Sequence, residues 1–162
     1  MTVMPVQEKR AGVLDTPLGK DKLAIVRFDG SEGVNELFEW RLEAVSAEGD
    51  IDFDGLIGKH ATLTINGVNG RKRKFDGIVT EARWLGVRDH FHAYRLVLRP
   101  WLWVLSQRTD NYIFHEMSVT DIIADVFSDY GALAEFDDRT SAAYPPIEYC
   151  VQYRESDMAF VC

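Results

Sequence analysis

The sequence is poor in cysteine, on whose disulfides small secreted proteins depend. It contains only 2 cysteines, Cys150 and Cys162, in 162 residues. Two thiols do not make a disulfide framework, so we expect both to be reduced and partly buried. Long hydrophobic runs are also lacking. The longest, such as residues 101–105, fall far short of the roughly 20 residues that cross a bilayer. We therefore expect no stable membrane insertion in this segment.

The start of the chain offers no export signal. Residues 1–10 lack the charged-then-apolar layout of a secretory signal peptide. We expect cytoplasmic synthesis without a signal peptide and, if the protein leaves the cell, a signal-independent route.

Basic residues are outnumbered, with 18 Lys and Arg against 26 Asp and Glu, for a net charge of −8. Nonspecific nucleic-acid binding is mostly a phosphate–cation interaction, so an acidic chain starts at a disadvantage and we expect no nucleic-acid partner. Residues 71–74 (Arg-Lys-Arg-Lys) are a local exception and follow two Asn-Gly pairs. We interpret them as the exposed end of a hairpin whose charges keep a strand edge from pairing.

Hydrophobic residues make up an ordinary 46% of the chain and alternate with polar ones in several segments. This period of two predicts strands at 23–28, 38–44, 62–65, 75–84 and 91–99. Pairs that tolerate positive φ separate or interrupt them, namely Asp29-Gly30, Asn66-Gly67, Asn69-Gly70 and Asp76-Gly77. Short strands at this spacing are typical of a barrel or sandwich, and Gly77 inside a strand suggests a bulge or sharp bend.

The pattern changes at Pro100. We expect the apolar residues 101–105 to fold over one end of the barrel. Ser118 predicts a helix start, with Asp121 at capping-box spacing and an i, i+3, i+4 apolar rhythm after it. Gly131 is expected to end this helix in the left-handed conformation.

The last residues predict a strand at 147–153 and then a second helix, capped by Ser156 with Asp157 in its first turn. Few residues follow, and so short a helix is marginal by itself. We therefore expect the chain to be a fragment that stops inside an element.

The fold class expected is mainly β with a minor α part: an antiparallel barrel, then a helix and the start of a second, incomplete barrel domain. Residues 1–20 would be an N-terminal arm or edge element, and 21–115 the β-barrel domain. Residues 116–162 would be the helix and the first part of the second domain, truncated at Cys162.

A calcium loop is suggested but not completed at residues 50–55 (Asp-Ile-Asp-Phe-Asp-Gly). Such a loop needs a bidentate Glu at its twelfth position, where this chain has Ala61. We interpret the segment as an acidic turn.

Other chemistry is equally incomplete. His90 and His92 flank Phe91 on a predicted strand but lack a third metal ligand, and His115-Glu116 lacks the second His of a zincin motif. No Ser has a Gly-x-Ser-x-Gly setting, and Cys150 has no basic neighbour to lower its pKa. We expect no catalytic, cofactor or metal site, and therefore no enzyme within these residues.

Several motifs occur together in a fixed order: 56–59 (Leu-Ile-Gly-Lys), 75–80 (Phe-Asp-Gly-Ile-Val-Thr), 94–105 (Tyr-Arg-Leu-Val-Leu-Arg-Pro-Trp-Leu-Trp-Val-Leu), 113–114 (Ile-Phe) and 149–157 (Tyr-Cys-Val-Gln-Tyr-Arg-Glu-Ser-Asp). As an ordered set they resemble the N-terminal part of VgrG, the valine–glycine repeat spike family of the bacterial type VI secretion system. The resemblance covers about residues 20–162. Its signature residues, expected to be structural, are Gly58, Gly77, Pro100, Trp101, Leu102, Trp103, Gln152, Tyr153, Glu155, Ser156 and Asp157.

The resemblance implies a structural hub related to that of contractile phage tails. It implies a homotrimer in the full-length parent, placed on a hexameric tail-tube protein. A downstream needle would carry a tip repeat protein and effectors, and some parents would add an effector enzyme. Export would then proceed through the type VI machine to the extracellular space or a target cell.

Two other functions stay open from the sequence. One is a baseplate hub of a contractile-tailed phage. The other, from a different class, is a small β-barrel module that binds oligonucleotides or oligosaccharides, which rests on residues 71–74 and the aromatic side chains.

Overall fold

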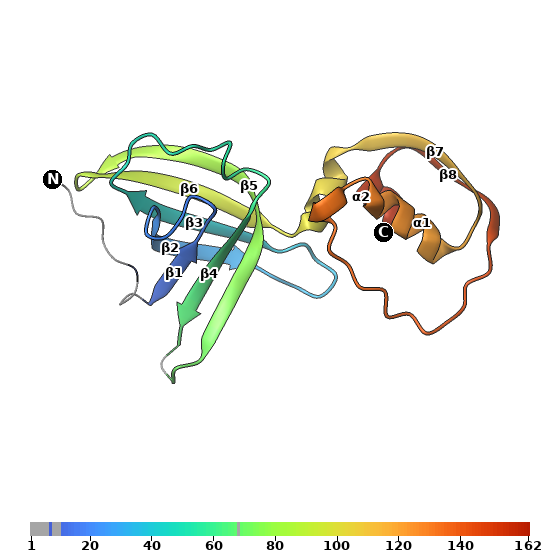
Figure 1. Cartoon of the computed structure of the whole chain (residues 1–162), viewed down its shortest axis with the longest axis horizontal. Coiled ribbons are helices and arrows are strands. Elements are labelled where there is room, and N and C mark those ends of the chain that lie inside the picture. The colour runs from blue at the N-terminus through green and yellow to red at the C-terminus, as the bar shows by residue number, and fades with distance from the viewer. Residues whose placement is uncertain (1–6, 8–10, 68) are drawn as a thin grey trace. The chain divides into compact units, whose positions relative to one another are not determined.

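The computed structural model describes residue 7 and residues 11–67 and 69–162. It divides into two compact units, unit 1 (Met1–Pro100) and unit 2 (Trp101–Cys162), each with its own core (Figure 1). Among the described residues, no helix is long and apolar enough to span a membrane.

Unit 1 is a curled antiparallel sheet of six strands in the order β1-β4-β5-β6-β3-β2 (Figure 1). The strands are β1 (Gly12–Asp15), β2 (Ala24–Ser31), β3 (Glu39–Ser46), β4 (His60–Asn66), β5 (Lys72–Arg88) and β6 (Phe91–Arg99). The strands predicted from alternation are confirmed, with ends that differ by a few residues. The expected fold class, mainly β with a minor α part, is also confirmed.

Local backbone geometry explains how the sheet curls. Strand β5 shifts register against β6 between Val79 and Glu81 and again between Trp84 and Gly86, and such bulges increase twist. The expected bulge at Gly77 is wrong, because Gly77 pairs in regular register with Ala61. The β5–β6 turn uses Asp89 and His90, both with positive φ, as a two-residue hairpin requires.

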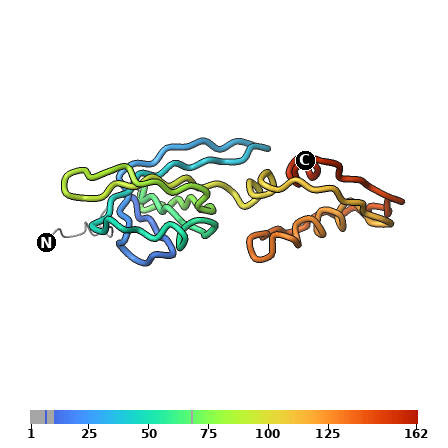
Figure 2. Tube along the Cα trace, turned by 90° about the horizontal axis from the view of Figure 1, so that it is seen from above, coloured from blue at the N-terminus to red at the C-terminus, as the bar shows by residue number. Residues whose placement is uncertain are grey.

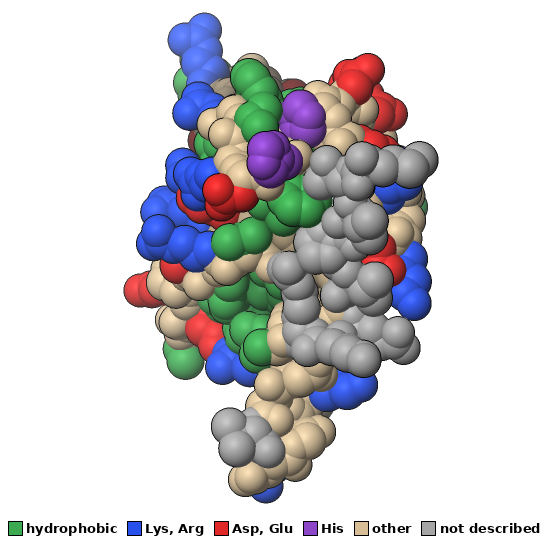
Figure 3. Space-filling view, turned by 90° about the vertical axis from the view of Figure 1, so that its left-hand side faces the viewer, with side chains coloured by type: hydrophobic (Ala, Val, Ile, Leu, Met, Phe, Trp, Pro, Cys, Tyr) green, Lys and Arg blue, Asp and Glu red, His purple; other side chains and the backbone are tan. Residues whose placement is uncertain are grey.

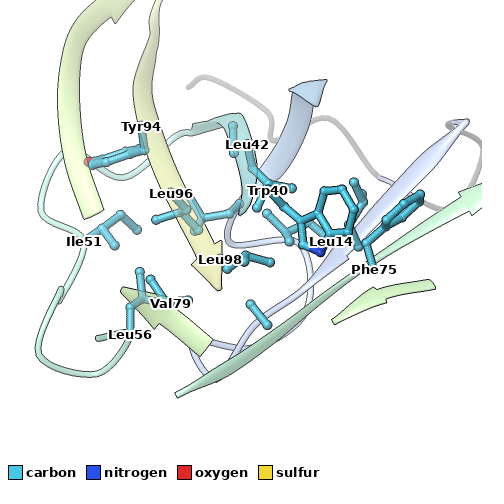
Figure 4. Packing of buried hydrophobic residues seen from close by; sticks show 14 residues of the cluster. Leu14, Trp40, Leu42, Ile51, Leu56, Phe75, Val79, Tyr94, Leu96 and Leu98 are labelled. Atoms are coloured by element: carbon cyan, nitrogen blue, oxygen red, sulfur yellow. The ribbon is translucent and has the colours of Figure 1, made fainter. Parts of the chain in front are cut away.

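The core of unit 1 lies on the concave face of this sheet (Figure 4). Leu42, Leu96 and Leu98 are 0% exposed. The segment 47–59 closes the concave side, because Ile51 and Leu56 are buried in the same cluster. Residues 50–55 are therefore an acidic turn held over a core, as interpreted from the sequence.

The edges of the sheet are β1 and β2. The expectation for residues 1–20 included an edge element, and Gly12–Asp15 is one, paired with β4. Buried Gln7 supports it: its side-chain oxygen accepts from the Leu14 N–H at 2.8 Å, and its amide donates to the Leu14 carbonyl at 3.2 Å. The rest of residues 1–10 lies outside the described part.

Unit 2 contains η2 (Trp101–Gln107), β7 (Thr109–Met117), α1 (Val119–Ser128), η3 (Gly131–Leu133), β8 (Ile147–Ser156) and α2 (Asp157–Val161). Strands β7 and β8 form an antiparallel pair, with α1 along one side (Figure 2). The capping box of Ser118 and Asp121 is confirmed. Gly131 has the expected positive φ, although α1 already ends at Ser128, with Asp129 as its C-cap.

The division of the chain falls between Pro100 and Trp101 rather than after residue 115. A boundary after 115 would cut β7, whose Phe114 lies in the core of unit 2. Residues 101–105, expected to fold over one end of the barrel, contribute Trp101, Leu102 and Leu105 to the unit 2 core. Apolar composition alone did not reveal which core they join.

Candidate functional site

The centre of the 149–157 signature is a buried carboxylate. Asp157, the first residue of α2, is 2% exposed. Its Oδ1 accepts from the Gln152 side-chain amide at 2.7 Å, and its Oδ2 accepts from the Tyr130 hydroxyl. Arg108 Nε lies 3.9 Å from Oδ2. A buried charge is tolerated only when it is paired and hydrogen-bonded, and these three partners supply that.

Arg108 joins three elements through one guanidinium. It reaches Asp129 beyond α1 and Asp110 in β7, each at 2.5 Å, as well as Asp157 in α2. The hydrogen bonds to Asp129 and then Asp110 raise the pKa of Arg108 above its usual range. The pKa of Asp110 is lowered, first by the Asn111 N–H and then by Arg108. Arg108 and Asp110 therefore keep their charges over the physiological pH range.

Tyr130 completes the network from the far side of Asp157. Burial first, and the hydrogen bond to Asp157 second, raise the pKa of its hydroxyl. The hydroxyl thus stays a donor to the carboxylate.

The other signature residues of this run bond through the backbone or lie on the surface. Ser156 caps α2, with Oγ accepting from the Ala159 N–H at 3.2 Å. The Glu155 carbonyl accepts from the Gln152 amide at 3.3 Å. Tyr153 is 65% exposed, with the Arg154 guanidinium 5.3 Å from its ring centroid. Gln152, Glu155 and Asp157 thus come together, whereas Tyr153 faces outward.

The Pro-Trp-Leu-Trp run starts unit 2. Pro100 has no N–H to donate and stands where β6 ends. Trp101 donates a hydrogen bond from Nε1 to the Glu135 carbonyl at 2.9 Å. Its ring packs edge-on against Phe127, with 4.8 Å between the ring centroids. Leu102 packs against the same core, and Trp103 is half-buried in η2.

The two signature glycines lie in unit 1. Gly58 has φ of 73°, and its N–H donates to the Val79 carbonyl at 2.9 Å, which ties segment 47–59 to β5. A Cβ on Gly77 would lie 2.9 Å from the Arg99 carbonyl oxygen. The signature residues of the two units are therefore brought together only within each unit.

A cleft of about 260 Å³ opens beside the Asp157 network. Its lining includes the Arg108 guanidinium, the Gln152 amide, the ring of Tyr112 and the carboxylates of Asp110, Asp125, Asp129 and Asp157. Within the described residues, no group of three or more His, Cys, Asp or Glu is placed to hold a metal ion. The cleft lining contains no Ser, Cys or His. Within unit 2 the network ties α2 to β7, to β8 and to the end of α1.

Unit 2 also exposes an apolar sheet face. Register pairs Ile113 with Val151 and His115 with Tyr149, and these alternate residues share the face opposite Phe114. The exposed fractions are 54% for Ile113, 45% for Val151 and 59% for Tyr149. Exposed apolar side chains in such a row are typical of interaction surfaces.

The sequence did not single out Arg108, Asp129 or Tyr130. They lie 27 to 49 residues before Asp157, and no periodicity links them to it. The only available signal was the cluster of charged residues at the ends of predicted elements.

The comparisons with known proteins agree with one another. A family model described as phage tail baseplate hub (GPD) matches residues 31–162. The chain belongs to this hub family. It is similar to the type VI secretion system spike protein VgrG1b of Pseudomonas aeruginosa, with 40% identity over 96% of this chain and 21% of that protein. The same organism's VgrG1c is 39% identical over the same shares.

The fold is shared with solved structures. The E. coli c3393 protein, described as a type VI component with structural similarity to T4 phage tail proteins gp27 and gp5, matches at TM-score 0.68 and 19% identity. That match covers 86% of this chain and 38% of the other. The resemblance to VgrG is confirmed, and the chain spans about a fifth of the length of these spike relatives.

Proposed function

We propose that this chain is a hub segment of a type VI secretion spike. It would form the base of a trimeric puncturing device that caps the tail tube and carries effectors to target cells. The observation that carries the proposal is the hub family match over residues 31–162, together with spike relatives at 40% and 39% identity.

The site supports a mechanical role. The signature residues close cores and tie strands, and the buried Asp157 network holds the ends of unit 2 together. A structural adaptor needs rigid units and exposed contact faces, and the chain offers both. The relatives are named as spike proteins, so we assign no enzyme to residues 1–162; an effector enzyme would be a fusion in a longer parent.

The partners follow from this role. They are two further copies of the chain, the hexameric tail-tube protein beneath them, and a needle-tip repeat protein and effectors that bind parts of the parent beyond these residues. The protein would be made in the cytoplasm without a signal peptide and leave through the type VI machine.

A baseplate hub of a contractile-tailed phage is the second candidate, because the matching family carries a phage description. The third sequence-based candidate, an oligonucleotide- or oligosaccharide-binding module, gains no support from the relatives.

The deciding experiment is an in-frame deletion of codons 12–161 in the producing strain. We expect tail-tube protein to disappear from the culture medium and to return on complementation, while tube protein inside the cell is unchanged. Unaltered tube release would reject the type VI role. If phage-like particles disappeared instead, the second candidate would stand.

A further inference from the structure

The basic run 71–74 has no role in the site described above. All four side chains are exposed at the tip of the β4–β5 hairpin. Arg73 is already engaged, because it pairs with Glu32 and lies 4.6 Å over the Phe75 ring. Among the described residues, no carboxylate forms an ion pair with Arg71, Lys72 or Lys74.

The strand register fixes where these cations lie. Lys72 is opposite Asn66 and Lys74 opposite Thr64, so both are on the outer face of the sheet. Arg73 is opposite Ile65, on the face that carries buried Phe75. Asp76, the nearest acid along the outer face, is occupied by His60 at 2.8 Å and Thr62 at 2.5 Å. The outer face of the tip therefore presents uncompensated positive charge.

Unit 1 carries the opposite charge at its other end. Segment 47–58 holds Glu48, Asp50, Asp52 and Asp54, all exposed. Of these, Glu48 pairs with Lys22 and Asp52 accepts from the Asp54 N–H. The segment is firmly held, since Leu56 is 0% exposed.

The two charged surfaces lie at opposite ends of unit 1. Segment 47–58 is at the top and the tip of the β4–β5 hairpin at the bottom of Figure 1. In Figure 3, acidic side chains gather at the upper right, while basic side chains lie along the left side and near the hairpin that projects at the bottom. One copy is thus unable to bring its own two surfaces together.

We propose that the basic hairpin tip (Arg71, Lys72 and Lys74) docks on the acidic segment (Asp50 and Asp54) of a second copy of this chain. Complementary charge on two different patches makes a head-to-tail contact, which generates a ring when the rotation closes. The contact rests on the proposed assembly into a homotrimer and names its surfaces. A polyanion such as nucleic acid is the alternative occupant, and the oligonucleotide arm of the test separates it from this contact.

The test is charge reversal followed by mixing. One variant is Lys72→Glu/Lys74→Glu and the other is Asp50→Lys/Asp54→Lys; each is checked for an unchanged far-ultraviolet circular dichroism spectrum. Sedimentation velocity is run at about 0.01 M and about 0.15 M salt, where screening lengths are ~30 Å and ~8 Å. The control is Asp137→Lys/Asp138→Lys, which makes in unit 2 the same charge change as Asp50→Lys/Asp54→Lys makes in unit 1.

We expect the wild type and the control to associate at low salt, and the association to weaken at the higher salt. Each reversal alone should weaken it about tenfold or more, because it places like charges opposite each other. An equimolar mixture of the two reversals should recover association, since each then supplies the surface that the other lacks.

The proposal is overturned if the wild type stays monomeric at low salt, if either reversal associates like the wild type, or if the mixture fails to recover. It is also overturned if Lys72→Glu/Lys74→Glu abolishes binding of a labelled single-stranded oligonucleotide but leaves self-association intact. If a charge reversal abolishes self-association while tube release stays normal, this contact is rejected and the spike function stands. Intact self-association without any effect of the deletion on tube release would reject the function alone.

Discussion

The two units reach stability by different means. Unit 1 surrounds a continuous apolar core on one face of a six-stranded sheet, including Leu42, Leu96 and Leu98 at 0% exposure. Unit 2 has a two-stranded sheet, a smaller core and a buried Asp157 tied to Arg108. Domains below about 70–80 residues rarely gain enough from an apolar core alone, so additional ties matter more. We therefore expect the Asp157 network to contribute to the stability of unit 2 what the larger apolar core contributes to that of unit 1.

The strongest way to break this comparison is to open a cavity in each core separately. Leu96→Ala in unit 1 and Leu105→Ala in unit 2 both remove a side chain that is 0% exposed. We expect a cost of about 2–5 kcal/mol in each case. Hydrogen exchange read by mass spectrometry should localise each loss of protection to its own unit. Equal loss in both units from one substitution would contradict the two-unit division.

Removing the buried carboxylate should affect only unit 2. Asp157→Ala leaves Gln152 and Tyr130 without their acceptor, and we expect a cost of about 3 kcal/mol in urea unfolding. Asp157→Asn, which keeps an acceptor oxygen, should cost less. Asp138→Ala is the control, since that side chain is exposed. Equal stability of Asp157→Ala and the control would show that the network contributes no cohesion.

Adding a methyl group at Gly77 tests how closely the strands of unit 1 pack. Its nearest neighbour would be the Arg99 carbonyl oxygen at 2.9 Å, which is backbone and is held in the sheet. We expect Gly77→Ala to cost about 1–3 kcal/mol. Gly33→Ala, which meets only the flexible end of Glu36, should stay within about 0.5 kcal/mol. Thermal unfolding of the two variants side by side tests this, and similar melting temperatures would disprove the close approach.

The smallest effect expected is a pH dependence in unit 1. Hydrogen bonding to Arg99, and then to Arg41, lowers the pKa of Glu39. A lowered folded-state pKa gives stability that is present above the unfolded value of about 4.3 and is lost as pH falls through the folded value. Glu39→Gln should therefore reduce the acid loss of unit 1 stability, by about 1 kcal/mol or less because the pair is partly exposed. Urea midpoints at neutral and acidic pH check it, and parallel curves would refute it.

Alternation predicted strands such as β3, which buries every second residue from Trp40 to Ser46. Strand β7 was missed: its polar residues 109–111 and exposed Ile113 give no such pattern, and its partner β8 begins 38 residues after β7 does. The capping box of Ser118 and Asp121 was predictable because both partners lie within one turn. The Asp157 network was not, because its partners are brought together only by tertiary folding.

Strand β6 has a mechanical consequence. It lies between β3 and β5, with backbone pairing on both sides, and it leads directly to Pro100. A pull applied at Pro100 therefore runs along β6 and loads both ladders in shear, so that many hydrogen bonds must rupture together. An edge strand such as β2 would instead peel from a single neighbour. Unit 1 is built to resist traction at the end from which the chain continues.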